Sequence, residues 1–173
     1  FDDSEYEIVV IDDCSTDRSK EIIYGFGSQV IFIKNNINSG LAASCNTAVK
    51  AAQGKFCVFV DSDDFISKNL LMVEHDILSY NKDSIDACSC DYYEVSEKET
   101  ILKRRDGMAH PIRCGIMYYT DHLIELGPYD ESEIREDLDF RKRFLQSGRY
   151  IYNLSIPYYR YTQNNLGLIK NPK

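Results

Sequence analysis

Short apolar runs alternate with amphipathic segments through the first half of the chain. The runs are rich in β-branched and aromatic residues and lie at residues 7–13, 28–35 and 55–61. Such runs are typical of strands buried on both faces of a sheet. Apolar residues recur at helical spacing in the segments that follow each run, at residues 14–27, 39–54 and 67–81. This alternation predicts right-handed crossovers over a mostly parallel sheet flanked by helices.

Polar and glycine residues mark the ends of these predicted helices. Ser15 or Thr16 is the expected N-cap of the first helix, and Gly25 or Gly27 its end. Ser67 is the expected N-cap of the third helix.

The second half of the chain has a different pattern. Residues 86–96 and 99–105 are expected to form two antiparallel strands, and residues 115–127 a turn followed by a short helix. Residues 136–148 have the spacing of a helix that ends at a glycine. Two late strands are predicted on either side of Pro157, because proline interrupts strand pairing. The fold class is therefore α/β, with a smaller antiparallel portion, in a single domain over residues 1–173.

Composition narrows the function classes. The chain has 173 residues, a formal net charge of −8 and 43% hydrophobic residues, which suits one globular domain. The excess of acid argues against nucleic-acid binding, which uses a basic face. No apolar run approaches the roughly 18 residues of a membrane span. The six cysteines contain no C-x-x-C pair, so we expect small buried hydrophobic residues in a reducing compartment.

Acidic residues gather where two of the predicted strands end. Asp12 and Asp13 end the first run, Asp61 ends the third, and Asp63 and Asp64 come just after it. Ligands of open α/β sheets bind at the carboxyl ends of the strands. Carboxylate oxygens select Mg²⁺ or Mn²⁺, and such an ion can neutralise a diphosphate leaving group. The alternative is that these aspartates only cap helices and face solvent in turns.

Five stretches in order resemble the inverting GT-A glycosyltransferases of family 2. They are "EIVVIDDCSTD", "NSGLAASCNTA", "VFVDSDDF", "LIELGPYDE" and "EDLDFRKRF", with "PYYRY" after the last. The resemblance spans nearly the whole chain and implies the GT-A (Rossmann-like) fold. It also implies a donor half at residues 1–85 and an acceptor half at residues 86–173.

The resemblance implies that six side chains bind a nucleotide-diphosphate sugar and its metal: Asp12, Asp13, Ser15, Asp61, Asp63 and Arg160. Asp13 is similar to the residue that hydrogen-bonds the nucleotide base, and Asp12 and Ser15 support its loop. Asp63 corresponds to the main ligand of Mn²⁺ or Mg²⁺, with Asp61 near the metal or the ribose. Arg160 would approach the diphosphate or close the loop over it.

The resemblance also implies roles on the acceptor side. Asp137 corresponds to the general base that takes the proton of the acceptor hydroxyl, so that direct displacement inverts the anomeric centre. Asp130, Glu131 and Glu136 would line the acceptor site. The acceptor class that the family suggests is a saccharide or a lipid-linked saccharide of the cell envelope. Assembly would take place in the cytoplasm, at the inner face of a membrane.

The chain departs from the family pattern at several points. A strand and a helix normally precede the "DD" strand, so we expect the sequence to start inside a longer protein. Cys45 stands where the family usually has Arg, and Thr162 and Gln163 stand where a His often contacts the metal. The Gln-x-x-Arg-Trp signature of processive synthases is missing, which favours transfer of one or a few sugars.

Two other function classes stay open on the sequence. A Mg²⁺-binding regulatory module of the phosphorelay-receiver type would also use strand-end aspartates, but no later strand-end Lys is evident. A degenerate or truncated transferase domain without catalysis would explain Cys45 and the missing first strand.

Overall fold

A computed structural model describes residues 5–127, 129–133 and 135–163, in two compact units. The described residues of Phe1–Cys57 and Tyr119–Gly148 form the first unit, and those of Val58–Tyr118 and Arg149–Lys173 form the second. Both units combine helices with strands, as the sequence pattern predicts. The functional division at residue 85 is a prediction about ligands, and it does not coincide with these structural units.

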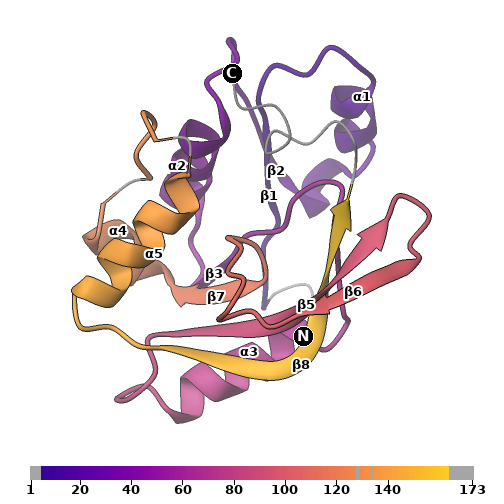
Figure 1. The fold of residues 1–173 in the computed structure, drawn as a ribbon. Coiled ribbons are helices and arrows are strands. Elements are labelled where there is room, and N and C mark those ends of the chain that lie inside the picture. The colour runs from indigo at the N-terminus through magenta and orange to yellow at the C-terminus, as the bar shows by residue number, and fades with distance from the viewer. Residues whose placement is uncertain (1–4, 128, 134, 164–173) are drawn as a thin grey trace. The chain divides into compact units, whose positions relative to one another are not determined.

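The first unit is built on a parallel strand pair with helices packed against it (Figure 1). Its elements are β1 (Val9–Asp12), α1 (Ser19–Tyr24), η1 (Gly27–Gln29), β2 (Ile31–Lys34), α2 (Leu41–Ala51), the first part of β3 (Phe56–Val58), α4 (Thr120–Glu125) and α5 (Glu136–Gln146). The predicted parallel crossover between the first two strands is confirmed, because Val9 of β1 pairs with Ile31 of β2 across α1. The prediction that the third strand joins them is wrong, because this sheet contains only β1 and β2 among the described residues. Helix α2 packs on β1 and on α4.

The predicted N-cap of the first helix is wrong. Helix α1 starts at Ser19, and its N-cap is Arg18. The backbone N–H of Ser15 is instead bound by Asp12, and Asp17 accepts the hydrogen bond from the N–H of Ser19. The predicted end is confirmed at Gly25. The strand-end loop therefore runs longer than the helical spacing suggested.

The second unit is a mixed sheet with one covering helix (Figure 1). Its elements are the last residue of β3, β4 (Phe65–Ile66), α3 (Leu70–Tyr80), β5 (Ala87–Ser96), β6 (Ile101–Arg105), all but the last residue of β7 (Ile116–Tyr119), and β8 (Ile151–Gln163). Strand β5 pairs parallel with β8 and antiparallel with β6 and β7, while β4 lies antiparallel to β8. Helix α3 packs against β5. Its N-cap is Asn69, so the prediction of Ser67 is wrong by two residues.

Two strand predictions in the second unit need correction. The apolar segment after Gly115 forms strand β7 rather than a turn, because its residues pair with β5. Strand β8 runs unbroken through Pro157. The register with β5 shifts on both sides of Asp91, which is paired with Pro157. A bulge leaves a residue outside the regular ladder, so the missing N–H of proline is tolerated there.

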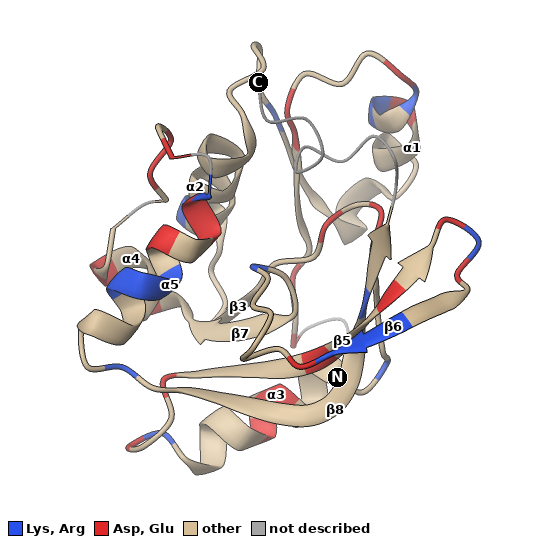
Figure 2. Ribbon diagram, viewed as in Figure 1, with Lys and Arg blue, Asp and Glu red and all other residues tan. Residues whose placement is uncertain are grey.

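Two arginines of β6 form ion pairs with acidic residues of β5. Figure 2 shows basic positions along β6 in blue beside acidic positions of β5 in red. Arg104 pairs with Asp91 at 2.7 Å, and Arg105 pairs with Glu94 at 2.8 Å. These basic residues therefore stabilise a hairpin.

Among the described residues, no helix has the length and apolar character needed to cross a bilayer.

All six cysteines are free thiols. Four of them are buried, as expected for small hydrophobic residues: Cys45, Cys88, Cys90 and Cys114.

Candidate active site

The loop after β1 brings three predicted donor residues together in the first unit. The Asp12 side chain is buried, and its Oδ1 accepts a hydrogen bond from Ser15 N at 2.8 Å. The hydrogen bonds from Ser15 lower the pKa of Asp12. Cys14 adopts a left-handed conformation with φ of 69°, which tightens the turn between them. The loop therefore presents an ionised carboxylate at the end of the strand.

Asp13 joins this loop to the segment before α2. Its carboxylate accepts hydrogen bonds from Asn35 Nδ2 at 2.8 Å, Ser39 N at 2.9 Å and Gly40 N at 2.7 Å. Burial raises the pKa of Asp13, but these hydrogen bonds outweigh it and the net pKa is lowered. Asp13 therefore fixes the loop after β1 to the segment before α2. Contact with a nucleotide base stays a prediction for this residue.

The three acids of the loop at residues 61–64, in the second unit, have different surroundings. Asp61 forms an ion pair with Arg113, whose side chain is 6% exposed against 36% for Asp61. Asp63 is exposed. Asp64 is half-buried, and its carboxylate accepts hydrogen bonds from Tyr159 Oη at 2.6 Å and Thr162 N at 2.7 Å. Only Asp61 and Asp63 were predicted to act in the site.

Asp64 ties the acidic loop to strand β8. Burial raises the pKa of Asp64 to about 6, although its hydrogen bonds from Thr162 and Tyr159 lower it. The Tyr159 oxygen also accepts a hydrogen bond from Asp61 N at 3.3 Å, and Thr162 Oγ1 donates to the carbonyl of Asp63. Thr162 therefore contacts the acidic loop from the position where the family often has His.

The donor atoms of the second unit fit a hard divalent cation. Carboxylate oxygens of Asp61 and Asp64 and the Sγ of Cys114 all lie within 4.8 Å of one another. Burial raises the pKa of the Cys114 thiol to about 12, so it is protonated at neutral pH and is a poor ligand. The carboxylates remain, and they favour Mg²⁺ or Mn²⁺ over softer metals.

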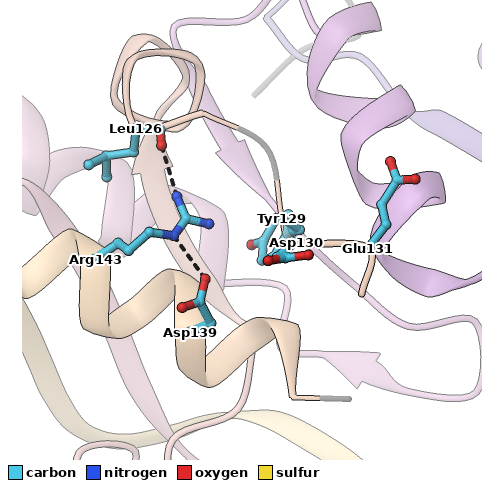
Figure 3. Close-up of a pocket in the computed structure, with 6 residues that line it drawn as sticks. All are labelled: Leu126, Tyr129, Asp130, Glu131, Asp139 and Arg143. Carbon is cyan, nitrogen blue, oxygen red and sulfur yellow. Dashed lines mark hydrogen bonds and ion pairs between the residues drawn. The ribbon is translucent and has the colours of Figure 1, made fainter. Parts of the chain in front are cut away.

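A pocket of about 530 Å³ in the first unit contains two of the predicted acceptor residues (Figure 3). It is lined by Leu126, Tyr129, Asp130, Glu131, Asp139 and Arg143. Arg143 Nε donates to Asp139 Oδ2, and Arg143 Nη1 donates to the carbonyl of Leu126, both at 2.8 Å. Hydrogen bonds from Ser132 lower the pKa of Asp130. The pocket is therefore acidic, with its one lining arginine already paired.

Asn46 holds the loop that carries these acceptor residues. Its Nδ2 donates to the carbonyl of Tyr129 at 3.0 Å and to Glu131 Oε1 at 3.1 Å, and its Oδ1 accepts from Tyr129 N at 2.7 Å. The Tyr129 ring packs on Phe140 with centroids 4.8 Å apart. Asn46 was not among the predicted site residues, although a polar residue among the apolar positions of α2 was a usable signal.

Asn46→Asp is expected to destabilise the protein by about 2 kcal/mol, because the new carboxylate lacks the donor hydrogens and faces Glu131. Chemical denaturation followed by circular dichroism measures the change. Asn38→Asp, at an exposed position of the same unit, serves as the control and should stay within about 0.5 kcal/mol of the wild type. Equal effects of the two substitutions would contradict the role of Asn46.

The remaining predicted residues lie at element ends and edges. Glu136 and Asp137 occupy the first turn of α5, where Glu136 is buried and Asp137 half-buried. The helix dipole favours ionised carboxylates at this end. Arg160, on β8, pairs with Glu99 at 3.3 Å. Their roles toward ligands stay predictions.

The chain matches a known family model over most of its length. Residues 2–135 match the model described as "Glycosyl transferase family 2".

Relatives and solved structures agree with this match. The poly(ribitol-phosphate) beta-N-acetylglucosaminyltransferase TarS of Staphylococcus aureus (strain Mu50) is 38% identical over 74 residues, 41% of this chain and 13% of that protein. The crystal structure of S. aureus TarS 1–349 in complex with UDP has a TM-score of 0.76 and 25% identity, covering 95% of this chain and 53% of that chain. The chain thus spans about half of the solved TarS fragment.

A third match concerns the fold alone. The mannosyltransferase PcManGT from Pyrobaculum calidifontis, in complex with GDP-Man and Mn²⁺, has a TM-score of 0.69 and 17% identity, covering 94% of this chain and 49% of that chain. Together with the TarS structure, it confirms the predicted GT-A fold.

Proposed function

The chain belongs to glycosyl transferase family 2, and we propose that it moves a sugar from a nucleotide-diphosphate sugar to an acceptor hydroxyl with inversion, assisted by Mn²⁺ or Mg²⁺. The observation that carries this proposal is the acidic loop, whose carboxylate oxygens converge at Asp61 and Asp64. The TarS structure with UDP and the PcManGT structure with GDP-Man and Mn²⁺ support a nucleotide donor and a divalent ion.

On the donor side, Asp63 and Asp61 would hold the metal, with the Asp64 carboxylate beside that of Asp61. When bound, the metal offsets the charge of the departing diphosphate. Asp12, Asp13 and Ser15 form the loop proposed for the nucleotide base. Arg160 would exchange Glu99 for a phosphate oxygen, since its ion pair is half-exposed and weak.

On the acceptor side, the Asp137 carboxylate is the proposed base. It would take the proton of the acceptor hydroxyl while that oxygen bonds to the anomeric carbon and the bond to the diphosphate breaks. Attack on the face opposite the leaving group inverts the centre. Asp130, Glu131 and Glu136 would orient the acceptor by accepting hydrogen bonds from its other hydroxyls.

The proposed acceptor is a saccharide or a lipid-linked saccharide in the synthesis of a cell-envelope polysaccharide or glycolipid, at the cytoplasmic face of a membrane. The name of the S. aureus relative, a transferase acting on poly(ribitol-phosphate), supports this class. Family membership removes the regulatory-module alternative. A transferase domain without catalysis remains the competing proposal, supported by Cys45 at a position where the family usually has Arg.

Nucleotide binding tests the proposal directly. We expect UDP or GDP to bind at least about tenfold tighter with MnCl₂ than with EDTA, because the cation joins the carboxylates to the diphosphate. Isothermal titration calorimetry measures both affinities. Asp63→Asn should abolish the gain from Mn²⁺, whereas Asp83→Asn, at an exposed position of the same unit, should retain it. If neither UDP nor GDP binds to the wild type, the proposed function is refuted.

A further inference from the structure

A buried arginine already supplies a positive charge to the acidic loop. The Nη2 of Arg113 donates to Asp61 Oδ1 and lies 3.6 Å from the Sγ of Cys114. Its guanidinium also lies over the ring of Phe59, 5.9 Å from the ring centroid. All four residues belong to the second unit, so the arrangement is internal to one compact body.

The ion pair is asymmetric in its exposure. The Arg113 side chain is 6% exposed, while Asp61 is 36% exposed and lies at the edge of the loop. A buried guanidinium costs several kcal/mol of solvation free energy unless a counter-charge lies beside it. Asp61 therefore stabilises the buried charge of Arg113, and Arg113 in turn orients the Asp61 carboxylate. Removing the arginine would leave one more uncompensated negative charge in the loop.

We propose that Arg113 is a positioning residue of the donor site, which holds Asp61 in place and offsets its charge. The loop consequently binds a free divalent cation weakly and attracts the anionic diphosphate more strongly than three bare carboxylates would. This inference rests on the proposed function, because it assigns the metal and the diphosphate to this loop. Arg113 was not among the site residues predicted from the sequence.

The expected effects follow from Coulomb's law. A unit positive charge several ångströms from a divalent cation opposes binding of that cation, and it favours binding of a diphosphate at a similar distance. Solvent and salt screen the charges at this half-exposed edge of the loop, so we expect each effect to be about fivefold in affinity. The two effects have opposite signs. Loss of local structure, by contrast, weakens both affinities.

The experiment compares the wild type with Arg113→Gln, Arg113→Lys and Arg105→Gln. Binding of Mn²⁺ alone is measured by electron paramagnetic resonance of the free ion, and binding of UDP and of GDP by calorimetry in EDTA. Arg113→Gln should bind Mn²⁺ about fivefold tighter and nucleotide about fivefold weaker. Arg113→Lys keeps the charge and should stay within about twofold of the wild type. Arg105, paired with Glu94 in the β5–β6 hairpin, is the matched control and should change neither affinity.

A second variant, Asp61→Asn, tests the inference in case Arg113→Gln does not fold. Asp61→Asn removes the negative charge beside the arginine, so it should bind Mn²⁺ more weakly and nucleotide in EDTA more tightly than the wild type. The inference is overturned if Arg113→Gln binds both Mn²⁺ and nucleotide more weakly than the wild type. It is also overturned if neither affinity differs from that of the wild type, which includes the case where binding is undetectable in both proteins. If Arg113→Gln does not fold, Asp61→Asn decides: nucleotide binding no tighter than in the wild type overturns the inference. Failure of the wild type to bind either nucleotide with Mn²⁺ present refutes the proposed function instead.

Discussion

Asp137→Asn is expected to lower the rate of sugar transfer by about a thousandfold, which is within the range attributed to a general base. Asparagine has the shape of aspartate but cannot accept the proton of the attacking hydroxyl. Nucleotide affinity should not change, because the base contacts the acceptor rather than the donor. The measurement is release of UDP or GDP from nucleotide sugars in the presence of a saccharide acceptor, together with calorimetry of the nucleotide alone.

Asp121→Asn is the matched control for this experiment. Asp121 is an exposed aspartate in the first turn of α4, in the same unit as Asp137. Its substitution should leave transfer within about twofold of the wild type. Retention of more than a tenth of the activity by Asp137→Asn would assign the base to another residue. Loss of nucleotide affinity along with activity would indicate a structural role.

Glu74→Met is expected to stabilise the protein by about 2 kcal/mol at pH 8, because an apolar side chain replaces a buried acid. Glu74 is 0% exposed, and it lies between Leu70 and Leu78 on the buried face of α3. Neither of its carboxyl oxygens has a hydrogen-bond partner among the residues that the structure describes. Methionine is similar in length and adapts to its surroundings, so the core can close around it.

The stability of the wild type should depend on pH through the same residue. Burial raises the pKa of Glu74 well above the ordinary value of 4.5. The folded state therefore binds the proton more tightly than the unfolded state does. The contribution of proton binding by Glu74 to the free energy of unfolding is complete below about pH 4.5. It is lost as the pH rises toward the pKa of Glu74 in the folded state. The free-energy difference between Glu74→Met and the wild type should thus widen with increasing pH.

Urea denaturation between pH 5 and pH 8 measures this difference. Glu97→Met, at an exposed position of the same unit, controls for a general effect of methionine and should follow the wild type at each pH. A constant difference between Glu74→Met and the wild type would show that Glu74 does not carry the pH dependence. A destabilised Glu74→Met would show that the carboxyl group has a partner in solution.

The sequence by itself determined the elements that depend on local pattern. Apolar runs and helical spacing identified β1, β2, α2, α3 and α5, because these patterns state which face of each element is buried. Five motifs in order identified the family and the fold, since the residues that form such loops lie close together in the chain. The acids at two strand ends were found for the same reason.

Tertiary structure alone decided the rest, because the partners are distant in the sequence. Strand β8 continues through Pro157, where extra residues of β8 shift its register with β5 on both sides of Asp91. The partner of Arg113 lies 52 positions away at Asp61, and Asn46 reaches Tyr129 across 83 positions. A buried polar group must find a partner or lose solvation free energy. The sequence states that such a group exists, but only the fold determines which residue pairs with it.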